Sequence, residues 1–163
     1  MQPIFVYSGT FDPPTYGHLT LLTEAARFFS EIIVVCSDYS IKNPKFSLDE
    51  RVALWRYYNL PSGVTVETID TFLARHIPGE QIVLIRGLRG EHDGKHEAHV
   101  LLESARNADI TKTLTFIASQ ETAHISSSKA WETAQRRDRE ALVSFVAPEI
   151  GDIVMQRIQE RMP

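Results

Sequence analysis

The stretch that decides the fold is residues 4–18, IFVYSGTFDPPTYGH, in which an apolar run leads into a loop containing glycine and proline. The run Ile4–Tyr7 is typical of a buried strand, and apolar residues then recur at helical spacing along residues 19–29. Gly9 permits a tight turn, and a helix that begins near Gly17-His18 presents backbone N–H groups and the positive end of its dipole to one crevice. The stretch therefore predicts a strand–loop–helix unit that binds an anion, most naturally a phosphate.

The order of strand and helix repeats along the chain. Three of the apolar runs are continuous rather than alternating, which is expected of parallel strands covered on both faces. The pattern predicts an α/β fold with a doubly wound, five-stranded parallel sheet, and ligands beyond the carboxyl ends of its strands. The predicted strands are Ile4–Tyr7, Ile32–Cys36, Val64–Val66, Ile82–Ile85 and Leu114–Ala118, and the predicted helices lie near 19–29, 47–59, 94–107, 127–137 and 148–161.

Composition narrows the class of protein. The 163 residues are the length of one ordinary domain, so we expect residues 1–163 to form a single domain. The net charge of −4 argues against a non-specific nucleic-acid binder, which needs a cationic face. No apolar run approaches the roughly 20 residues that span a bilayer, and the start Met1-Gln2-Pro3-Ile4 is unlike a secretory signal. With one cysteine, Cys36, which we expect to be buried and inert, we expect a cytoplasmic location and no membrane partner.

Three polar segments each allow more than one interpretation. Ser126, Ser127 and Ser128 precede a predicted helix, where they fit either an ordinary N-cap or a site for the β- and γ-phosphates of a nucleotide. The charged segment 135–140 fits a solvated surface. A third set lies on one face of the predicted helix 94–107 and fits a polar surface or a subunit contact better than a metal site; its members are His92, His96, His99 and Glu103.

Four motifs arrive in an order that resembles one enzyme superfamily. They are Gly9-Thr-Phe-Asp-Pro13 with Thr15-x-Gly17-His18, Lys42 ahead of Leu48–Val52, Leu84-Ile-Arg-Gly-Leu-Arg89, and Ile125-Ser-Ser-Ser128. Together they resemble the nucleotidyltransferases, and most closely the phosphopantetheine adenylyltransferase family. Thr15, where most branches of the superfamily carry a first histidine, is the form typical of that family.

The resemblance implies a Rossmann-like nucleotidyltransferase fold and the transfer of AMP from ATP to 4′-phosphopantetheine, with Mg²⁺ bridging the ATP phosphates. It implies a homo-oligomer, a hexamer in the family. It assigns catalysis to His18, Lys42 and Arg86, and the acceptor site to Thr10, Asp70, Lys42 and Arg86. For ATP it implies Thr10, Phe11, His18, Gly87, Leu88, Arg89, Glu97, Ser126, Ser127 and Ser128.

The chain departs from the family pattern at several positions. The segment Asp93-Gly-Lys-His-Glu97 lacks two aromatic residues, now Gly94 and His96, and Asp70 stands where an apolar residue is usual. Trp131 occupies the place of a basic residue, a charge that Lys129 or Arg136 could replace. Two alternatives therefore stay open: a related transferase with another acceptor, of the cytidylyl or nicotinate-mononucleotide type, and a nucleotide-binding sensor without turnover. Thr15 and the Arg86–Arg89 motif favour the adenylyltransferase over the other transferases.

Overall fold

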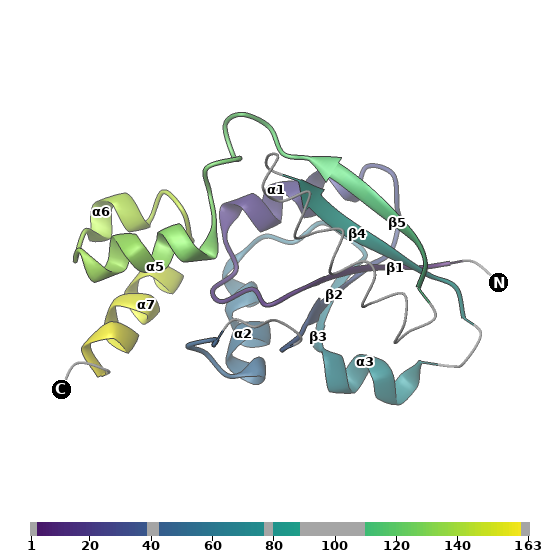
Figure 1. The fold of residues 1–163 in the computed structure, drawn as a ribbon, viewed down its shortest axis with the longest axis horizontal. Helices are drawn as coiled ribbons and strands as arrows, with labels where there is room; N and C mark the ends of the chain where they lie inside the picture. The colour runs from purple at the N-terminus through teal and green to yellow at the C-terminus, as the bar shows by residue number, and fades with distance from the viewer. Residues whose placement is uncertain (1–2, 39–42, 77–79, 89–109, 161–163) are drawn as a thin grey trace.

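The computed structural model describes residues 3–38, 43–76, 80–88 and 110–160 (Figure 1). Its five strands form one sheet in the order β3-β2-β1-β4-β5, and every neighbouring pair is parallel. The strand order reverses between β1 and β4, so their carboxyl ends form the switch point at which such sheets bind ligands. The predicted doubly wound parallel sheet is confirmed. The strands are β1 (Ile4–Gly9), β2 (Ile32–Cys36), β3 (Val64–Thr68), β4 (Ile82–Leu88) and β5 (Ile110–Ile117).

Side chains alternate between two apolar faces of the sheet, as a strand period of two requires. On one face Tyr7, Val34 and Ile85 join the larger core with α1 (Tyr16–Ala25), α2 (Leu48–Leu54) and the 3₁₀ turn η1 (Trp55–Tyr57). On the other face Val6 and its neighbours pack against Phe72 of α3 (Ile69–Arg75). Helices therefore cover both faces, which accounts for the continuous apolar runs of the strands.

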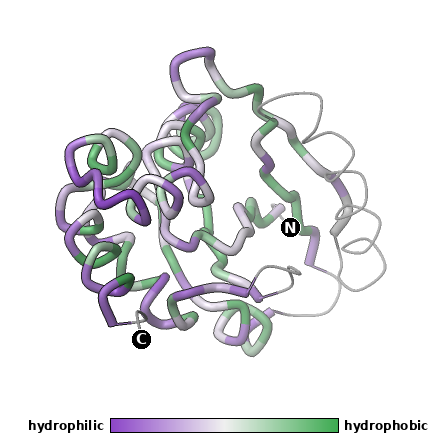
Figure 2. The backbone as a smooth tube through the Cα atoms, turned by 60° about the vertical axis from the view of Figure 1, so that its left-hand side comes forward, coloured by the Kyte–Doolittle hydropathy of each residue, from purple (hydrophilic) through white to green (hydrophobic). Residues whose placement is uncertain are grey.

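Three helices, α5 (Ser127–Gln135), α6 (Arg139–Leu142) and α7 (Pro148–Glu160), pack together at one side of the sheet (Figure 1). Each turns its apolar residues toward the others, and hydrophilic and hydrophobic segments alternate around their turns in Figure 2. The backbone N–H of Tyr16 donates to the carbonyl of Phe145 at 2.9 Å, which joins this cluster to the start of α1. The cluster thus stands at the carboxyl ends of the strands, beside the switch point.

The boundaries differ from the sequence expectation in several places. β5 begins at Ile110, four residues before the predicted start. Helix α3 was not predicted, because its seven residues are too few for a readable period. The segment expected to be a solvated surface also contains the start of α6, although its exposure is confirmed for residues 135–140. The predicted helix 94–107 lies outside the described residues. Among the described helices, none combines the length and apolar character that a bilayer crossing needs.

Candidate active site

The loop between β1 and α1, residues 10–15, is called the first loop below. It leads into the Thr15-x-Gly17-His18 motif. Thr15 is the N-cap of α1 and is fully buried, and His18 stands three residues into the helix. The backbone N–H of Thr15 donates to Nδ1 of His18 at 3.0 Å, and the Thr15 hydroxyl lies 3.0 Å from the same atom. Because Nδ1 accepts, the neutral ring carries its proton on Nε2. A threonine at position 15 therefore fixes both the orientation and the tautomer of His18.

Phe11 packs behind the histidine. Its ring meets the His18 ring edge-on, with centroids 5.0 Å apart, and also contacts Tyr7 and Trp55 at 5.1 and 5.3 Å. A Cβ on Gly9 would lie 2.9 Å from this ring, so only glycine fits there. The backbone of Phe11 has φ of 49°, a left-handed value that is uncommon for a bulky residue. Since Phe11 is 3% exposed, its ring is part of the core and offers no surface to a nucleotide.

Four carbonyl oxygens of this loop accept hydrogen bonds from partners elsewhere in the chain. Arg51 donates to the carbonyl of Thr10 at 2.8 Å, and Tyr58 to that of Pro14 at 3.0 Å. Burial raises the pKa of the Tyr58 hydroxyl, which keeps it protonated as a donor. From α5, the Trp131 ring N–H and the Ser127 hydroxyl donate to Asp12 and Pro13, each at 2.8 Å. The negative ends of these four peptide dipoles thus point into the protein, which favours an anion on the loop's other side.

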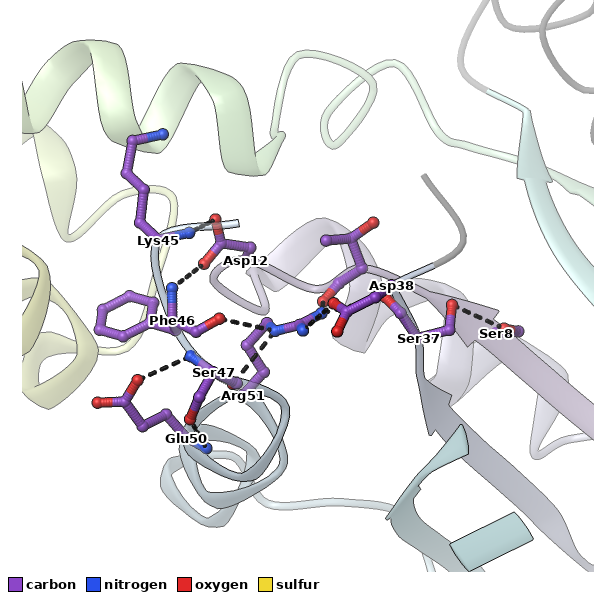
Figure 3. Close-up of polar contacts among 10 residues, drawn as sticks. Ser8, Asp12, Ser37, Asp38, Lys45, Phe46, Ser47, Glu50 and Arg51 are labelled. Carbon is purple, nitrogen blue, oxygen red and sulfur yellow. Dashed lines mark hydrogen bonds and ion pairs between the residues drawn. The ribbon is translucent and has the colours of Figure 1, made fainter. Parts of the chain in front are cut away.

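The segment before α2 is tied to the same loop. The buried carboxylate of Asp12 accepts the backbone N–H groups of Lys45 and Phe46, at 2.8 and 3.1 Å (Figure 3). Both bonds join residues more than 30 positions apart in the sequence. Residues 43–46, which directly follow the predicted Lys42, are therefore fixed against the first loop. Lys42 itself lies outside the described residues.

Arg51 of α2 is fully buried at the centre of these contacts (Figure 3). Besides Thr10, its guanidinium donates to the carbonyls of Ser37, Phe46 and Ser47 at 3.1–3.2 Å. It also pairs with the half-exposed carboxylate of Asp38. Sequence reasoning did not single out this residue as part of the site. A signal was present, because Arg51 lies three, four and seven residues before the buried Leu54, Trp55 and Tyr58, on the apolar face of the predicted helix.

Arg86 and Gly87 lie near the end of β4, beside β1. Arg86 donates from Nη1 to the carbonyl of Ser8 at 3.2 Å, which places its side chain next to the start of the first loop. A Cβ on Gly87 would lie 2.4 Å from the end of the Leu21 side chain of α1, so a larger residue here would require that side chain to move. Leu88 ends the strand. Arg89 and Glu97, the other predicted ATP residues of this region, lie outside the described residues, as do His92, His96 and His99.

The three serines at the start of α5 take three different positions. Ser126 is the N-cap, and its hydroxyl accepts the backbone N–H of Lys129 at 3.2 Å. Ser127 holds the carbonyl of Pro13, and Ser128 is exposed. The cap interpretation is thus confirmed for Ser126, while a phosphate role stays a prediction for this helix start.

Trp131 is 5% exposed and packs against Phe46, with ring centroids 5.5 Å apart. The ammonium of Lys45 lies 4.7 Å from the centre of the Trp131 ring, a cation–π contact. Lys45 therefore brings a positive charge beside the position where the family pattern has a basic residue. Trp131 itself anchors the first loop through its bond to the Asp12 carbonyl. That Lys129 or Arg136 replaces the positive charge of the family pattern stays a prediction.

Three of the four predicted pieces meet at one edge of the sheet. His18 lies in the first turn of α1, Arg86 contacts the end of β1, and Ser127 contacts the loop between β1 and α1. Asp70 is exposed in the first turn of α3, directly after β3 and thus also at a carboxyl end, but two strands away from β1. Among the described residues no group of three His, Cys, Asp or Glu side chains could hold a metal ion.

Comparisons with known proteins identify the family. Residues 6–133 match the model of the cytidylyltransferase-like family. The chain is 37% identical over 139 residues to the phosphopantetheine adenylyltransferase of Alkalilimnicola ehrlichii, covering 82% of this chain and 79% of that protein. It is 34% identical over 160 residues to the phosphopantetheine adenylyltransferase of Proteus mirabilis, covering 96% and 97%.

Solved structures agree on the fold. The nicotinic acid mononucleotide adenylyltransferase of Plasmodium falciparum, complexed with NaAD, superimposes with a TM-score of 0.63 at 16% identity, covering 98% of this chain and 96% of that one. This likeness supports the Rossmann-like nucleotidyltransferase architecture and, at such identity, nothing finer. From the sequence relatives and the family model together, the chain belongs to the cytidylyltransferase-like nucleotidyltransferases, and among them to the phosphopantetheine adenylyltransferase family.

Proposed function

We propose that this enzyme transfers the adenylyl group of ATP to 4′-phosphopantetheine. An oxygen of the acceptor phosphate forms a bond to the α-phosphorus of ATP, and the bond from that phosphorus to the β-phosphate oxygen breaks. The products are dephospho-coenzyme A and pyrophosphate. The attacking oxygen is already ionised at neutral pH, so the protein has to supply alignment and positive charge rather than a strong base.

The observation that carries this proposal is the fixed ring of His18. With Nδ1 held by the backbone of Thr15, Nε2–H is the donor that meets an α-phosphate oxygen as charge develops there. The N–H groups at the start of α1 and the inward carbonyls of the first loop favour the same anion. Thr10, at the start of this loop, hydrogen-bonds a phosphate oxygen between the two reactants.

Two cations hold the acceptor phosphate. The contact of Arg86 with Ser8 at the end of β1 supports this role, and its planar guanidinium suits a two-point grip on phosphate. Lys42 supplies the second, movable charge. On the nucleotide side, Gly87, Leu88, Arg89 and Glu97 line the ATP site, and Ser128 with the start of α5 meets the β- and γ-phosphates.

Mg²⁺ fits this arrangement as a companion of ATP. It keeps most of its ligands as water and phosphate oxygens, so it needs few protein carboxylates. When bound it neutralises the charge of the leaving pyrophosphate. The residues that would share it are those at the start of α5.

Assembly and location belong to the same proposal. We expect a homo-oligomer, supported by exposed apolar side chains such as Phe28 and Ile117, which are 72% and 83% exposed in the described part of the chain. Light scattering that gives the monomer mass would contradict it. A cytoplasmic location is consistent with the single cysteine, Cys36, whose burial raises its thiol pKa to about 12.

The test of function is pyrophosphate release from ATP or CTP with several phosphorylated acceptors, including 4′-phosphopantetheine and nicotinate mononucleotide. We expect turnover with ATP and 4′-phosphopantetheine alone. His18→Ala should abolish it, whereas His76→Ala, which changes a histidine at the end of α3, should not. Turnover with another combination of nucleotide and acceptor would show that the proposed substrates are wrong. ATP binding without any turnover would indicate a nucleotide-binding sensor.

A further inference from the structure

Arg51 is a fully buried charged group beside the first loop, and the proposed mechanism does not use it. Its side chain is fully buried between α2, the end of β2 and the first loop (Figure 3). Burying a charge is costly, and an apolar side chain of similar volume beside Leu54 and Trp55 would often give an equally stable core. Stability alone therefore does not account for an arginine here.

An arginine at this position joins three segments of the chain through one side chain. Its Nε–H is shared between the carbonyls of Phe46 and Ser47, Nη1 donates to those of Thr10 and Ser37, and Nη2 donates to the Asp38 carboxylate. The acceptors come from the first loop (Thr10), from the end of β2 (Ser37 and Asp38) and from the segment before α2 (Phe46 and Ser47). No other side chain could satisfy all of them at once.

The contact with the first loop bears directly on His18. Arg51 holds the carbonyl of Thr10, and the next residue, Phe11, has the left-handed φ of 49°. Such a conformation persists where the surroundings determine it. The Phe11 ring in turn supports the edge of the His18 ring at 5.0 Å. Fixing the peptide between Thr10 and Phe11 thus fixes the group against which the histidine lies.

We propose that Arg51 is a positioning residue for the adenylyl transfer, acting through the Thr10–Phe11 peptide on Thr10 and His18. The proposal rests on the proposed function, because it concerns the rate of that reaction. A positioning role differs from a purely structural one in its consequence. Changing Arg51 should slow the chemical step and not only lower the free energy of unfolding.

The chain offers a matched control in Arg157 of α7. This arginine also donates to a carbonyl of the segment before α2, that of Lys45 at 2.8 Å, and also pairs with a carboxylate, Glu50 of α2. None of its bonds in the described structure reaches the first loop. Arg51→Lys and Arg157→Lys therefore remove similar contacts near α2, but only the first alters the hold on Thr10.

The experiment compares both variants with the wild-type chain by pyrophosphate release, thermal unfolding and amide hydrogen exchange of residues 8–18. For Arg51→Lys we expect kcat to fall about tenfold to a hundredfold, since small misplacements of reacting groups have effects of that size. We expect KM for ATP to stay within about twofold and exchange in the loop to become faster. Arg157→Lys should lower the melting temperature with kcat and loop exchange unchanged.

Two results would overturn the inference: kcat that falls equally in both variants, or loop exchange in Arg51→Lys that matches the wild type. If the wild-type chain releases no pyrophosphate, the proposed function is wrong, and the exchange comparison alone decides whether Arg51 positions the loop. Should Arg51→Lys fail to fold, Asp38→Asn replaces it, because Asp38 is half-exposed and the carbonyl contacts of Arg51 remain. That variant should show a smaller fall in kcat and a smaller rise in exchange, because it weakens the hold on the guanidinium without removing its bond to Thr10.

Discussion

Helices α1 and α5 both begin beside the first loop, and they use their first polar residues differently. In α1 the buried Thr15 caps the helix and holds Nδ1 of His18. In α5 Ser126 caps the helix, and Ser127 holds the carbonyl of Pro13. The comparison teaches that a helix start of the right composition can either present a group to a ligand or hold a loop in place, and that the hydrogen bonds decide between the two.

The largest expected effect tests the α1 side through two changes at position 18. His18→Gln keeps a side chain that can accept the Thr15 N–H, as in a capping box, but lacks the ring donor. We expect kcat to fall by about 10²–10³, the usual effect of losing one transition-state donor. Steady-state pyrophosphate release measures it.

His18→Ala provides the control for that change, since it removes both the donor and the cap. It should lose the same activity and in addition about 1 kcal/mol of stability by chemical denaturation. If His18→Gln retained wild-type kcat, the ring would serve only as a cap, and the contrast between the two helices would disappear.

A smaller effect is expected on the α5 side, at Trp131. Trp131→Phe keeps an aromatic ring against Phe46 but removes the donor to the buried carbonyl of Asp12. An unsatisfied buried acceptor costs about 1–3 kcal/mol, so urea denaturation should show a loss of that size. Trp131→Lys, which restores the basic residue of the family pattern, should lose more because it also removes the ring and adds a charge near Lys45. Unchanged stability in both would show that α5 does not anchor the loop.

Variants of the two adjacent serines should distinguish a residue that holds the first loop from one that binds ATP. Ser127→Ala is expected to reduce stability by about 1 kcal/mol through the lost bond to Pro13. Ser128→Ala should leave stability within about 0.5 kcal/mol, because it is an exposed surface change, and raise KM for ATP severalfold. Denaturation and KM measured on the same pair would sharpen the comparison, and a reversed pattern would assign the phosphates to Ser127.

The smallest effect concerns pH and a carboxylate that lies away from the loop. The hydrogen bond from Arg157, and that from the backbone of Ser47, lower the pKa of Glu50 below its ordinary value. Because the folded-state pKa is the lower one, this contribution to stability is present above the unfolded pKa and is lost as pH falls through the folded value.

Glu50→Gln retains an acceptor for the Ser47 N–H but removes the charge. Its stability deficit relative to the wild type should therefore shrink as pH falls from about 6 to about 3. A deficit that does not depend on pH in thermal melts would show that the ion pair with Arg157 contributes nothing.

The features that could be predicted from the sequence are the local ones. The strand of Ile4–Tyr7 and the helix after the loop depend on neighbouring residues, and both are confirmed, whereas Gly9, where a tight turn was expected, is the last residue of β1. The family likewise followed from motifs in a fixed order, and the sequence relatives confirm it. The roles of the individual site residues stay predictions, since they depend on a bound nucleotide.

The features that could not be predicted are contacts between distant positions. Arg51 reaches Thr10 across 41 positions, and Trp131 reaches Asp12 across 119. Composition at either end gives no sign of such a pair, so Trp131 looked like the loss of a cation. The tertiary structure shows that Trp131 instead donates a hydrogen bond to the backbone of the first loop.

The chain has two tryptophans, and both border the first loop. Trp55 contacts the ring of Phe11, and the indole N–H of Trp131 is bonded to the carbonyl of the next residue, Asp12. Intrinsic fluorescence therefore reports on this loop without any label, because emission depends on ring contacts and on hydrogen bonding of the indole. A titration with ATP, read at the tryptophan emission maximum, offers a direct spectroscopic view of the loop in the unmodified protein.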